Sequence, residues 1–511
     1  MSENTSLKPR HVLQFVVMVL VLLLLLAAIF PNDGIKITDD FRLKFISVQQ
    51  IFDPPKQPSK DISGILKNTE ITEDSLQDAA FDEVPKTDRD SAMVDSEYVY
   101  YNARPIHIDS VVQFLEFPPS KPDLFYGLYE EMAEIRNTGD LIRFMHYGDS
   151  QVEQDRITNY FRFKIQQQFG GYGPGLVPAV QAFDFELPMK QGKQGDWKRY
   201  TAFGRKDTAV SHDRYGVMGA FAQFAPLTPD STFRYSENET LSPQHKYQAS
   251  LSFLPSRYAY SNAKKYSRSR MFLGNITKPL DLKVLADDKL IEEKRLEPNP
   301  DLQVLSYAFE KTPDKLTFEF ESLDSPEFYG FSFDTYKGII VDNIPMRGCS
   351  GLMFTRMDLT FASRIYRMLN TKLLILQFGG NVVPAEKEDY DYYRKSFAYR
   401  LRSLKRAIPG IHIIVIGPSD MSKKEDDIYI TRPEVPMVRD AMKQAAFEND
   451  CAFWDMYQAM GGENSMPSWV FYDPPLAEKD FIHFTPQGAK YVAKMFYNAF
   501  IADYNRFLRK R

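Results

Sequence analysis

The sequence predicts an α/β protein whose parallel sheet is interrupted by an all-β insertion and preceded by a transmembrane helix. Strands alternate with helices in residues 105–182 and again in 339–511, which is typical of βαβ units around a parallel sheet. Between them, residues 183–338 carry short strand-like runs separated by turn residues, without a helical period. This density of short strands predicts a β-sandwich or jelly roll.

The first segment, residues 1–31, is predicted to be an uncleaved signal anchor. Lys8 and Arg10 precede the apolar run Val12–Phe30. A helix of that length, at about 1.5 Å per residue, spans close to the ~30 Å hydrocarbon core. The run ends without the small-residue pattern of a cleavage site, and a basic flank is typical of the cytoplasmic side. We expect a single-pass protein with a cytoplasmic N-terminus and a periplasmic or extracellular remainder.

The next segment, residues 32–104, mixes short apolar patches with acidic and polar runs and recurrent prolines, so we predict a tether of low order. The α/β domain then occupies residues 105–182 and 339–511, and residues 183–338 form the inserted β-sandwich.

The composition excludes some classes of function. The net charge of −5 argues against nucleic acid as the main partner, because phosphate binding needs a basic face. The two cysteines, Cys349 and Cys451, are too few for a disulfide framework. We favour two buried free thiols, with a single bridge as the alternative. Neither cysteine has the neighbours of a metal site, and no metal or cofactor is implied.

The first part of the α/β domain contains one complete strand with its flanking helices. An amphipathic helix is predicted over 123–136, followed by a turn and an apolar strand over 141–147. Gly148-Asp149-Ser150 ends the strand, and helical spacing then runs over 151–168. That helix should stop at Gly170, since glycine is the preferred residue just beyond a helix C-terminus.

The rest of the chain supplies the insert and the remaining βαβ units. The predicted insert strands include 282–285, 302–309, 316–320 and 328–333. The later strands are predicted over 373–378, 411–416 and 451–455, and the later helices over 388–407, 433–448 and 486–504.

Ser150 is a candidate nucleophile because of its position. It lies where an apolar strand ends and a helix is predicted to begin, so its hydroxyl should project from the carboxyl edge of the sheet, where ligands bind in open α/β folds. A backbone N–H at a helix N-terminus would also favour an oxyanion. The alternative is a helix N-cap, for which serine is a preferred residue.

Asp480 and His483 could provide the base that a serine nucleophile needs. The carboxylate precedes the histidine by three residues, just ahead of the helix predicted from Pro486. A turn with this spacing can bring the carboxylate to Nδ1 while Nε2 faces outward. The alternative is an ordinary solvated loop.

An oxyanion hole would require hydrogen-bond donors near Ser150. Asn381 follows an apolar strand and two glycines, and its amide is suited to this role, although Gly-Gly-Asn is also a common turn. Gly348 could supply a backbone N–H, with Gly351 as a near alternative.

Other polar residues are predicted to be structural. We expect His146 to pack or hydrogen-bond within its strand, and His412, which lies in a buried strand pattern, to be structural. Asp455 should cap the helix that follows it, and Asp149 should stabilise its turn.

These residues resemble the sequence blocks of the SGNH/GDSL hydrolase superfamily, in the same order. Gly148-Asp149-Ser150 matches block I, Gly348 the glycine of block II, Asn381 the asparagine of block III, and Asp480 with His483 block V. The resemblance implies a flavodoxin-like parallel sheet with helices on both faces. It also implies that Ser150, Asp480 and His483 form the triad, with Ser150, Gly348 and Asn381 around the oxyanion.

The resemblance extends over about residues 110–180 and 335–505, including the runs 169–177, 416–421 and 453–469. Those runs look like the branch that acts on O-acetylated polysaccharides, including peptidoglycan O-acetylesterases. In that branch a carbohydrate-binding-like β domain is inserted between blocks I and II, which is where the β-rich stretch lies in this sequence.

The resemblance implies an exported, membrane-anchored serine esterase that removes O-acetyl groups from a polysaccharide or peptidoglycan. One alternative is a polysaccharide O-acetyltransferase with the same triad, which would receive acyl groups from a membrane-bound O-acyltransferase partner. The other is a non-catalytic glycan-binding module on a hydrolase fold. We expect the insert to lie beside the active-site mouth, where the aromatic run 328–331 could stack on sugars, although such residues more often pack in a core.

Overall fold

The computed structural model describes residues 9–31, 34–38, 42–43, 45–46, 57–69, 110–183, 185–226, 246–425 and 427–511. The predicted tether therefore lies largely outside the described residues. The chain divides into two units, residues 1–58 with 424–430, and residues 59–423 with 431–511.

The first unit contains the apolar helix α1 (Pro9–Ile29), whose side chains are almost all apolar. Within the described residues, α1 is the one helix long and apolar enough to cross a membrane. This unit also contains the short antiparallel pair β1 (Ile35–Lys36) and β2 (Arg42–Leu43).

The second unit is built around a parallel sheet. Among the described residues, its strand order is β15-β3-β16-β17-β20. The bounds of these strands are β3 (Leu141–Gly148), β15 (Gly338–Pro345), β16 (Thr371–Gln377), β17 (His412–Ile416) and β20 (Ala452–Trp454). The predicted strands are confirmed, but β15 was not foreseen as a member of this sheet.

The register brings the carboxyl ends of the strands together. Gly148 is paired with Pro345 on one side and with Gln377 on the other, and Gln377 is paired with Ile416. The next strand continues the alignment through Ile416 and Trp454. The segments that follow these strands therefore meet at one edge of the sheet.

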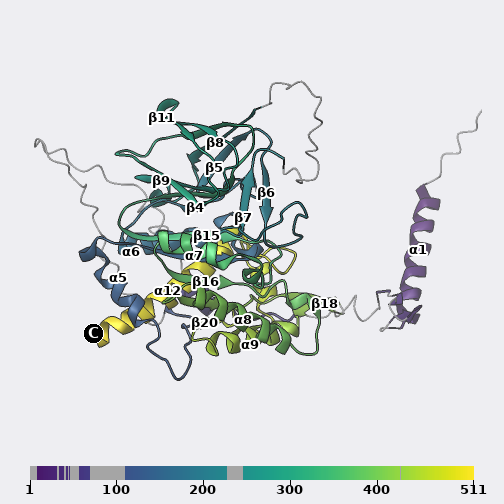
Figure 1. Cartoon of the computed structure of the whole chain (residues 1–511). Coiled ribbons are helices and arrows are strands. Elements are labelled where there is room, and N and C mark those ends of the chain that lie inside the picture. Colours follow the sequence, from purple (N-terminus) through teal and green to yellow (C-terminus); the bar gives the residue numbers. More distant parts are fainter. Residues whose placement is uncertain are drawn as a thin grey trace, which may run out of the picture. The chain divides into compact units, whose positions relative to one another are not determined.

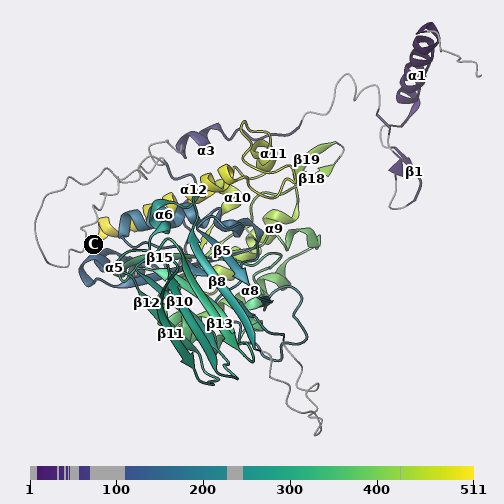
Figure 2. The ribbon, with the colours of Figure 1, turned by 90° about the horizontal axis from the view of Figure 1, so that it is seen from above.

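Helices cover both faces of the sheet (Figures 1 and 2). Met145 and Tyr147 of β3 belong to the core shared with α7–α9, whereas Phe144 packs against Phe500 of α12. This is the alternation expected of a strand buried on both faces. One face carries α5 (Tyr126–Thr138), α6 (Thr158–Phe169) and α12 (Pro486–Lys510), and the other carries α7 (Leu359–Met368), α8 (Asp391–Ala407) and α9 (Glu434–Phe447).

The described residues also contain shorter elements. Their bounds are α3 (Ser63–Asn68), α10 (Met456–Ala459), α11 (Ser465–Val470), the hairpin strands β18 (Ser422–Glu425) and β19 (Ile428–Thr431), and the 3₁₀ turns η2 (Ser150–Asp155), η3 (Ser261–Lys264), η4 (Met353–Arg356) and η5 (Val383–Ala385).

The insert contains two antiparallel sheets, so the predicted sandwich is confirmed. Within the described part of the chain, one sheet has the order β11-β10-β13-β8-β5, and the other has β12-β9-β14-β7-β6 with β4 paired to β14. The bounds are β4 (Gly175–Val177), β5 (Met189–Gln194), β6 (Lys198–Thr201), β7 (Ala220–Gln223), β8 (Tyr247–Pro255), β9 (Arg268–Gly274), β10 (Leu280–Ala286), β11 (Lys289–Leu296), β12 (Gln303–Ala308), β13 (Leu316–Ser322) and β14 (Glu327–Asp334).

The aromatic run 328–331 is not a sugar-stacking surface. Phe328, Tyr329 and Phe331 are buried, and Phe331 contacts Phe253 and Phe318 between the two sheets. The suggestion that these rings contact sugar is therefore wrong. Their apolar surface instead forms the core of the insert and its junction with the α/β domain.

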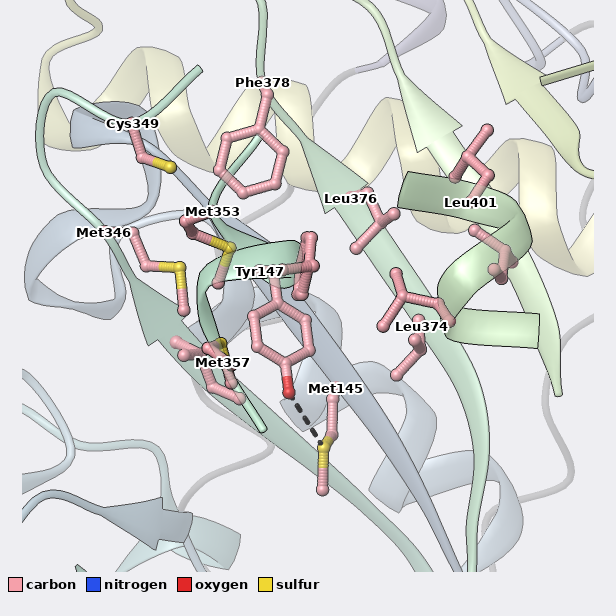
Figure 3. Close-up of a cluster of buried hydrophobic side chains, with 14 of the residues drawn as sticks. Met145, Tyr147, Met346, Cys349, Met353, Met357, Leu374, Leu376, Phe378 and Leu401 are labelled. Carbon is pink, nitrogen blue, oxygen red and sulfur yellow. Dashed lines mark hydrogen bonds between the residues drawn. The ribbon is translucent and has the colours of Figure 1, made fainter. Parts of the chain in front are cut away.

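The insert and the α/β domain share a core beneath the carboxyl edge of the sheet. Tyr147 is fully buried among methionines that include Met346 and Met353 (Figure 3). Its hydroxyl donates to the carbonyl of Val217, an insert residue, at 2.8 Å and lies 2.6 Å from the Tyr366 hydroxyl. The strand that leads to Ser150 is therefore packed directly against the insert.

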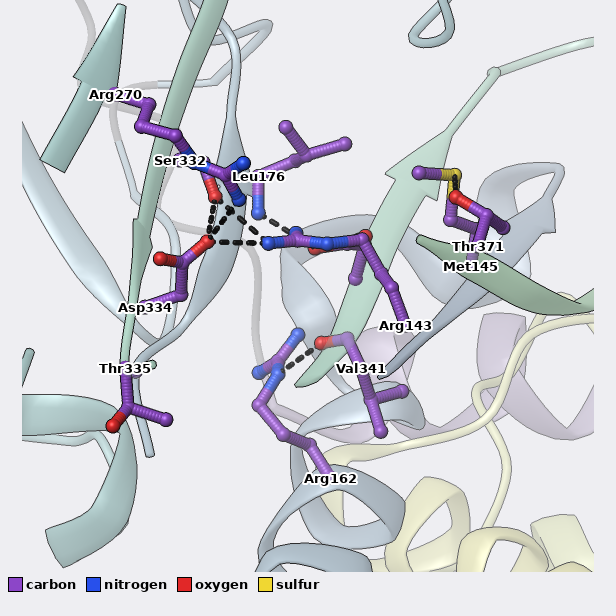
Figure 4. Close-up of polar contacts among 12 residues, drawn as sticks. Arg143, Met145, Arg162, Leu176, Arg270, Ser332, Asp334, Thr335, Val341 and Thr371 are labelled. Carbon is purple, nitrogen blue, oxygen red and sulfur yellow. Dashed lines mark hydrogen bonds and ion pairs between the residues drawn. The ribbon is translucent and has the colours of Figure 1, made fainter. Parts of the chain in front are cut away.

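A buried ionic cluster joins the same two parts (Figure 4). Arg143 of β3 pairs with Asp342 of β15 at 2.6 Å and with Asp334 of β14 at 2.5 Å. Arg268 and Arg270 of β9 also pair with Asp334, at 2.8 and 2.7 Å. Burial opposes ionisation of Asp334, but the three guanidinium groups prevail and lower its pKa to about 2.

Candidate active site

The structure brings Ser150, His483 and Asp480 into one hydrogen-bonded chain. Ser150 Oγ lies 2.8 Å from His483 Nε2, and His483 Nδ1 lies 2.6 Å from Asp480 Oδ2. A carboxylate can only accept, so Nδ1 carries the proton and Nε2 is left to accept the Ser150 hydroxyl proton. This is the arrangement of a nucleophile with an oriented general base.

Asp480 is fixed in its own turn as well as to the imidazole. Its Oδ1 accepts the backbone N–H groups of Ile482 and His483 at 2.9 and 3.0 Å. Partial burial tends to raise the pKa of Asp480, but the bonds from His483 and Ile482 outweigh it and lower the pKa below its ordinary value. The carboxylate is therefore held in its ionised form opposite Nδ1.

The segment after Ser150 differs from the predicted helix over 151–168. A 3₁₀ turn occupies Ser150–Asp155, broken by Gln154 with φ of 56°, and the α-helix α6 begins only at Thr158. The Asp155 carboxylate forms a buried ion pair with Arg162 of α6, at 2.5 Å. An α-helix dipole consequently does not act at Ser150, and that part of the prediction is wrong.

Asp149 stabilises the nucleophile turn, as the sequence analysis expected. Its Oδ1 accepts the backbone N–H of Gln151 at 3.0 Å, so Asp149 and not Ser150 caps the turn. Its Oδ2 accepts Asn381 Nδ2 at 3.1 Å. Burial raises the pKa of Asp149 to about 6, despite these two hydrogen bonds and the nearby His483.

Asn381 lies at the same edge of the sheet, after β16. Its Nδ2 donates to Asp149 and also to the backbone carbonyl of Cys349, at 3.1 and 3.3 Å. Both amide hydrogens therefore have partners in the resting site.

The two candidate glycines have different surroundings. Gly351 is buried, and a Cβ there would lie 2.9 Å from the rings of Phe378 and Phe397. The N–H of Gly351 faces Cys349 Sγ at 3.4 Å. Gly348 is exposed, with φ of 72° and no atom within 4 Å of an added Cβ. Gly351 is therefore packed into the core, whereas Gly348 lies at the surface outside the lining of the pocket at Ser150, and the oxyanion role of Gly348 stays a prediction.

A pocket of about 130 Å³ opens beside the Ser150–His483 pair. Its polar lining includes Gln151, Ser419 and Asn381. The remainder is mainly apolar, with Phe378, Pro384, Pro418, Met421, Met456 and Ile482. A short acyl group and part of a polar leaving group would both find complementary surface there.

The remaining polar candidates are structural, as predicted. His146 Nε2 lies 3.0 Å from Gln377 Oε1, and burial lowers its pKa to about 4. His412 packs edge-on against Phe125, and Asp455 accepts the N–H of Gln458 at the start of α10.

The cysteine prediction is also confirmed. Cys349 and Cys451 are buried free thiols, and burial raises the pKa of each, to about 11 and 12.

Two residues near the triad were missed by the sequence analysis. Gln151 Nε2 donates to the carbonyl of Ile482 at 2.7 Å, and Arg156 Nη1 donates to the carbonyl of Phe484 at 3.2 Å. Both brace the turn that carries His483. Their position after the nucleophile was visible in the sequence, but their partners lie more than three hundred residues away.

No family model and no curated protein matches the sequence. Among solved structures, a peptidoglycan O-acetylesterase matches 76% of this chain and 99% of its own length, with 16% identity and a TM-score of 0.58. The chain has the SGNH hydrolase fold. The predicted fold, an SGNH sheet interrupted by an all-β insertion, is confirmed.

Two other solved structures resemble the SGNH fold of this chain less. A family two carbohydrate esterase from Clostridium thermocellum in complex with cellohexaose matches 51% of this chain and 93% of its own, with 9% identity and a TM-score of 0.23. A salicylyl-acyltransferase from a tetracycline biosynthetic pathway matches 50% and 82%, with 13% identity and a TM-score of 0.25.

Proposed function

We propose that this protein is a membrane-anchored, exported SGNH-type serine esterase that removes O-acetyl groups from a polysaccharide or peptidoglycan. The observation that carries the proposal is the chain of contacts from Ser150 Oγ through His483 to Asp480, at 2.8 and 2.6 Å. The fold shared with a peptidoglycan O-acetylesterase supports the choice of substrate class.

The first half of the reaction forms an acyl-enzyme. Ser150 Oγ attacks the acetyl carbonyl carbon while His483 Nε2 takes the hydroxyl proton. The imidazolium is stabilised by Asp480. The tetrahedral intermediate collapses by breaking the bond to the sugar oxygen, which receives the proton from His483 and leaves as a hydroxyl.

The second half returns the enzyme to its starting state. A water molecule gives a proton to His483 and adds its oxygen to the acetyl carbonyl of the acyl-enzyme. Collapse of this second intermediate breaks the bond to Ser150 Oγ, which takes the proton back from His483, and releases acetic acid, which ionises to acetate. In both halves the backbone N–H groups of Ser150 and Gly348, with the Asn381 amide, would stabilise the oxyanion.

Transfer of the acetyl group to a sugar hydroxyl would use the same acyl-enzyme, with sugar in place of water. A membrane-bound O-acyltransferase partner would then be the acyl source. The anchoring helix α1 suits either reaction, because it would hold the site near the envelope. The preformed Ser150–His483 bond argues against a non-catalytic glycan-binding module.

The test uses the detergent-solubilised full chain with 4-nitrophenyl acetate and with an acetylated oligosaccharide. Ser150→Ala should reduce acetate release by several orders of magnitude while the protein remains folded. Turnover retained by the folded variant would disprove the assignment. Adding an unacetylated acceptor sugar distinguishes the two reactions, since a transferase would form acetylated acceptor at the expense of free acetate.

A further inference from the structure

Gln151, the residue after the proposed nucleophile, has no role in the mechanism described so far. Its side chain is only 6% exposed and lines the pocket beside Ser150 and His483. The amide Nε2 donates to the Ile482 carbonyl at 2.7 Å and lies 3.5 Å from Ser419 Oγ. The other amide atom, Oε1, is buried and has no hydrogen-bond partner among the described residues.

The bond from Nε2 connects the two halves of the catalytic pair. Ile482 directly precedes His483, so this bond ties the residue after the nucleophile to the residue before the base. The turn needs such support because Phe481 has φ of 58°, a conformation that a bulky residue rarely adopts. Gln151 therefore helps to fix the 2.8 Å separation between Ser150 Oγ and His483 Nε2.

The same bond also fixes which way Oε1 faces. An amide flip would place two oxygens against each other at Ile482, so Nε2 stays on the carbonyl and Oε1 stays as the acceptor. The pocket of about 130 Å³ would hold about four water-sized groups and is otherwise mainly apolar. Gln151 lines this pocket together with Ser150 and His483, and a small shift of its buried amide would let a donor bound there reach Oε1.

Two other buried glutamines have the same hydrogen bonding as Gln151 but lie away from the pocket at Ser150. Gln166 and Gln223 also donate through Nε2 to a backbone carbonyl, at 3.0 and 2.9 Å, and also have a buried Oε1 without a partner among the described residues. Neither lines the pocket at Ser150. Of these three glutamines, Gln151 is the one whose side chain lines that pocket.

We propose that Gln151 both positions His483 and selects the substrate, with Oε1 accepting a hydrogen bond from a hydroxyl or amide N–H that neighbours the ester on the sugar ring. This inference rests on the proposed esterase function. It defines the preferred substrate as an ester with an adjacent donor, as in a partly acetylated hexose or an N-acetylated amino sugar. An aryl acetate, which has no such donor, would use only the positioning role.

The test compares Gln151→Met with Gln223→Met in the full chain. Methionine keeps the length and apolar stem of glutamine but removes both polar atoms. For 4-nitrophenyl acetate, Gln151→Met should lower kcat about tenfold with little change in KM. For acetylated oligosaccharides, kcat/KM should fall by a further factor of about five to ten, the effect of one lost hydrogen bond. Gln223→Met should leave the ratio between the two substrates unchanged.

Gln151→Glu separates the two roles, because it keeps an acceptor oxygen and loses the donor to Ile482. It should lower kcat on both substrates while preserving the preference for the glycan. Acetylated cello-oligosaccharides and acetylated chito-oligosaccharides distinguish a hydroxyl donor from an amide N–H.

Three outcomes would overturn the inference. These are equal losses on the aryl ester and the glycans in Gln151→Met, no loss on either, or a glycan preference abolished by Gln151→Glu. Failure of the esterase proposal would look different, since Ser150→Ala would then retain turnover whatever happens at Gln151.

Discussion

Asn381 Nδ2 donates to Asp149 Oδ2 at 3.1 Å, and this bond connects a proposed oxyanion donor to a buried carboxylate beside the nucleophile. The two residues follow adjacent strands, β16 and β3, so the sheet register brings them together. A second bond, to the Cys349 carbonyl at 3.3 Å, uses the other hydrogen of Asn381 Nδ2. These two bonds fix the orientation of the amide, and one of them must be released before Nδ2 can donate to an oxyanion.

Replacing Asn381 should affect the chemical step more than binding. Asn381→Ala removes a donor to the oxyanion, and we expect kcat to fall by about 10²- to 10³-fold with little change in KM. Steady-state kinetics with 4-nitrophenyl acetate measures both parameters. Asn299→Ala, which removes a turn side chain of the insert, is the control and should keep normal kinetics. A rise in KM at constant kcat would mean that Asn381 binds substrate without stabilising the transition state.

Asp149 should make the folding stability fall as the pH rises. Its folded-state pKa is about 6, against 3.8 for an unperturbed carboxyl, so between these values the folded protein binds more protons than the unfolded chain. The contribution is fully present below pH 4 and lost above pH 6, and amounts to roughly 3 kcal/mol. Asp149→Asn removes this titration. Urea unfolding at pH 4, 5, 6 and 7 should show the variant gaining stability relative to the parent, whereas parallel curves would contradict the assignment.

The buried cluster around Arg143 should be essential for stability. Arg143→Met leaves Asp334 and Asp342 in a dry environment without their main partner, which we expect to cost about 3–5 kcal/mol of unfolding free energy. The matched control is Arg295→Met, because Arg295 pairs with Asp281 at 2.9 Å on the surface and should contribute less than about 1 kcal/mol. Chemical denaturation of both variants measures the free energy of unfolding. A similarly small decrease in the two variants would show that the cluster does not stabilise the fold.

The insert carries exposed rings close to the nucleophile turn. Tyr258 is 52% exposed and contacts Phe185, which is 43% exposed, at 5.5 Å between ring centroids. The backbone N–H of Leu187 donates to Gln154 of η2 at 3.4 Å, and that of Ser256 donates to Pro188 at 3.2 Å. These contacts support the expectation that part of the insert lies beside the active-site mouth.

Removing one of these rings should weaken binding of polymer only. Tyr258→Ala should raise KM about fivefold for an acetylated polysaccharide and leave 4-nitrophenyl acetate turnover unchanged, because an aromatic face can stack on a sugar. Tyr336 is an equally exposed control. It precedes β15 and so lies at the opposite edge of the sheet from Ser150. Equal effects of Tyr258→Ala and Tyr336→Ala would rule out presentation of substrate at this surface.

Whether α1 is retained as a membrane anchor can be tested separately. If α1 remains in the mature protein, the full chain should fractionate with membranes, and protease added from the exported side should digest the residues beyond Pro31. A soluble mature chain whose N-terminus begins near residue 30 would show that the apolar run is a cleaved signal peptide.

The sequence was sufficient to predict most elements and the grouping of the site residues. In a parallel sheet the carboxyl ends of neighbouring strands meet at one edge. Ser150, which follows an apolar strand, was therefore expected at that edge, next to the segments that follow the other strands. Asp480 and His483 were recognisable because their interaction is local, within one turn. The catalytic roles themselves stay predictions until variants are measured.

What could not be predicted depends on distant contacts. The helical spacing of 151–168 hid the break at Gln154, which is stabilised by the pair between Asp155 and Arg162. The strand β15 follows the insert directly and looks like one more of its short strands. The sequence also could not show which aromatic side chains are exposed. The run 328–331 has the composition of a binding surface, but its rings are buried in a core.

The strand order has a consequence for biosynthesis. The strand β3 ends just before the nucleophile and lies between β15 and β16 in the sheet. Both of these neighbouring strands follow the insert in the chain. A ribosome that has reached residue 330 has therefore produced Ser150 but neither strand that will flank it. Domains generally fold as units during synthesis, with earlier segments first, and an apolar strand without partners invites aggregation. The insert is nearly complete before the sheet that it interrupts can begin to form, so the nascent chain must keep Leu141–Gly148 covered until the later strands emerge.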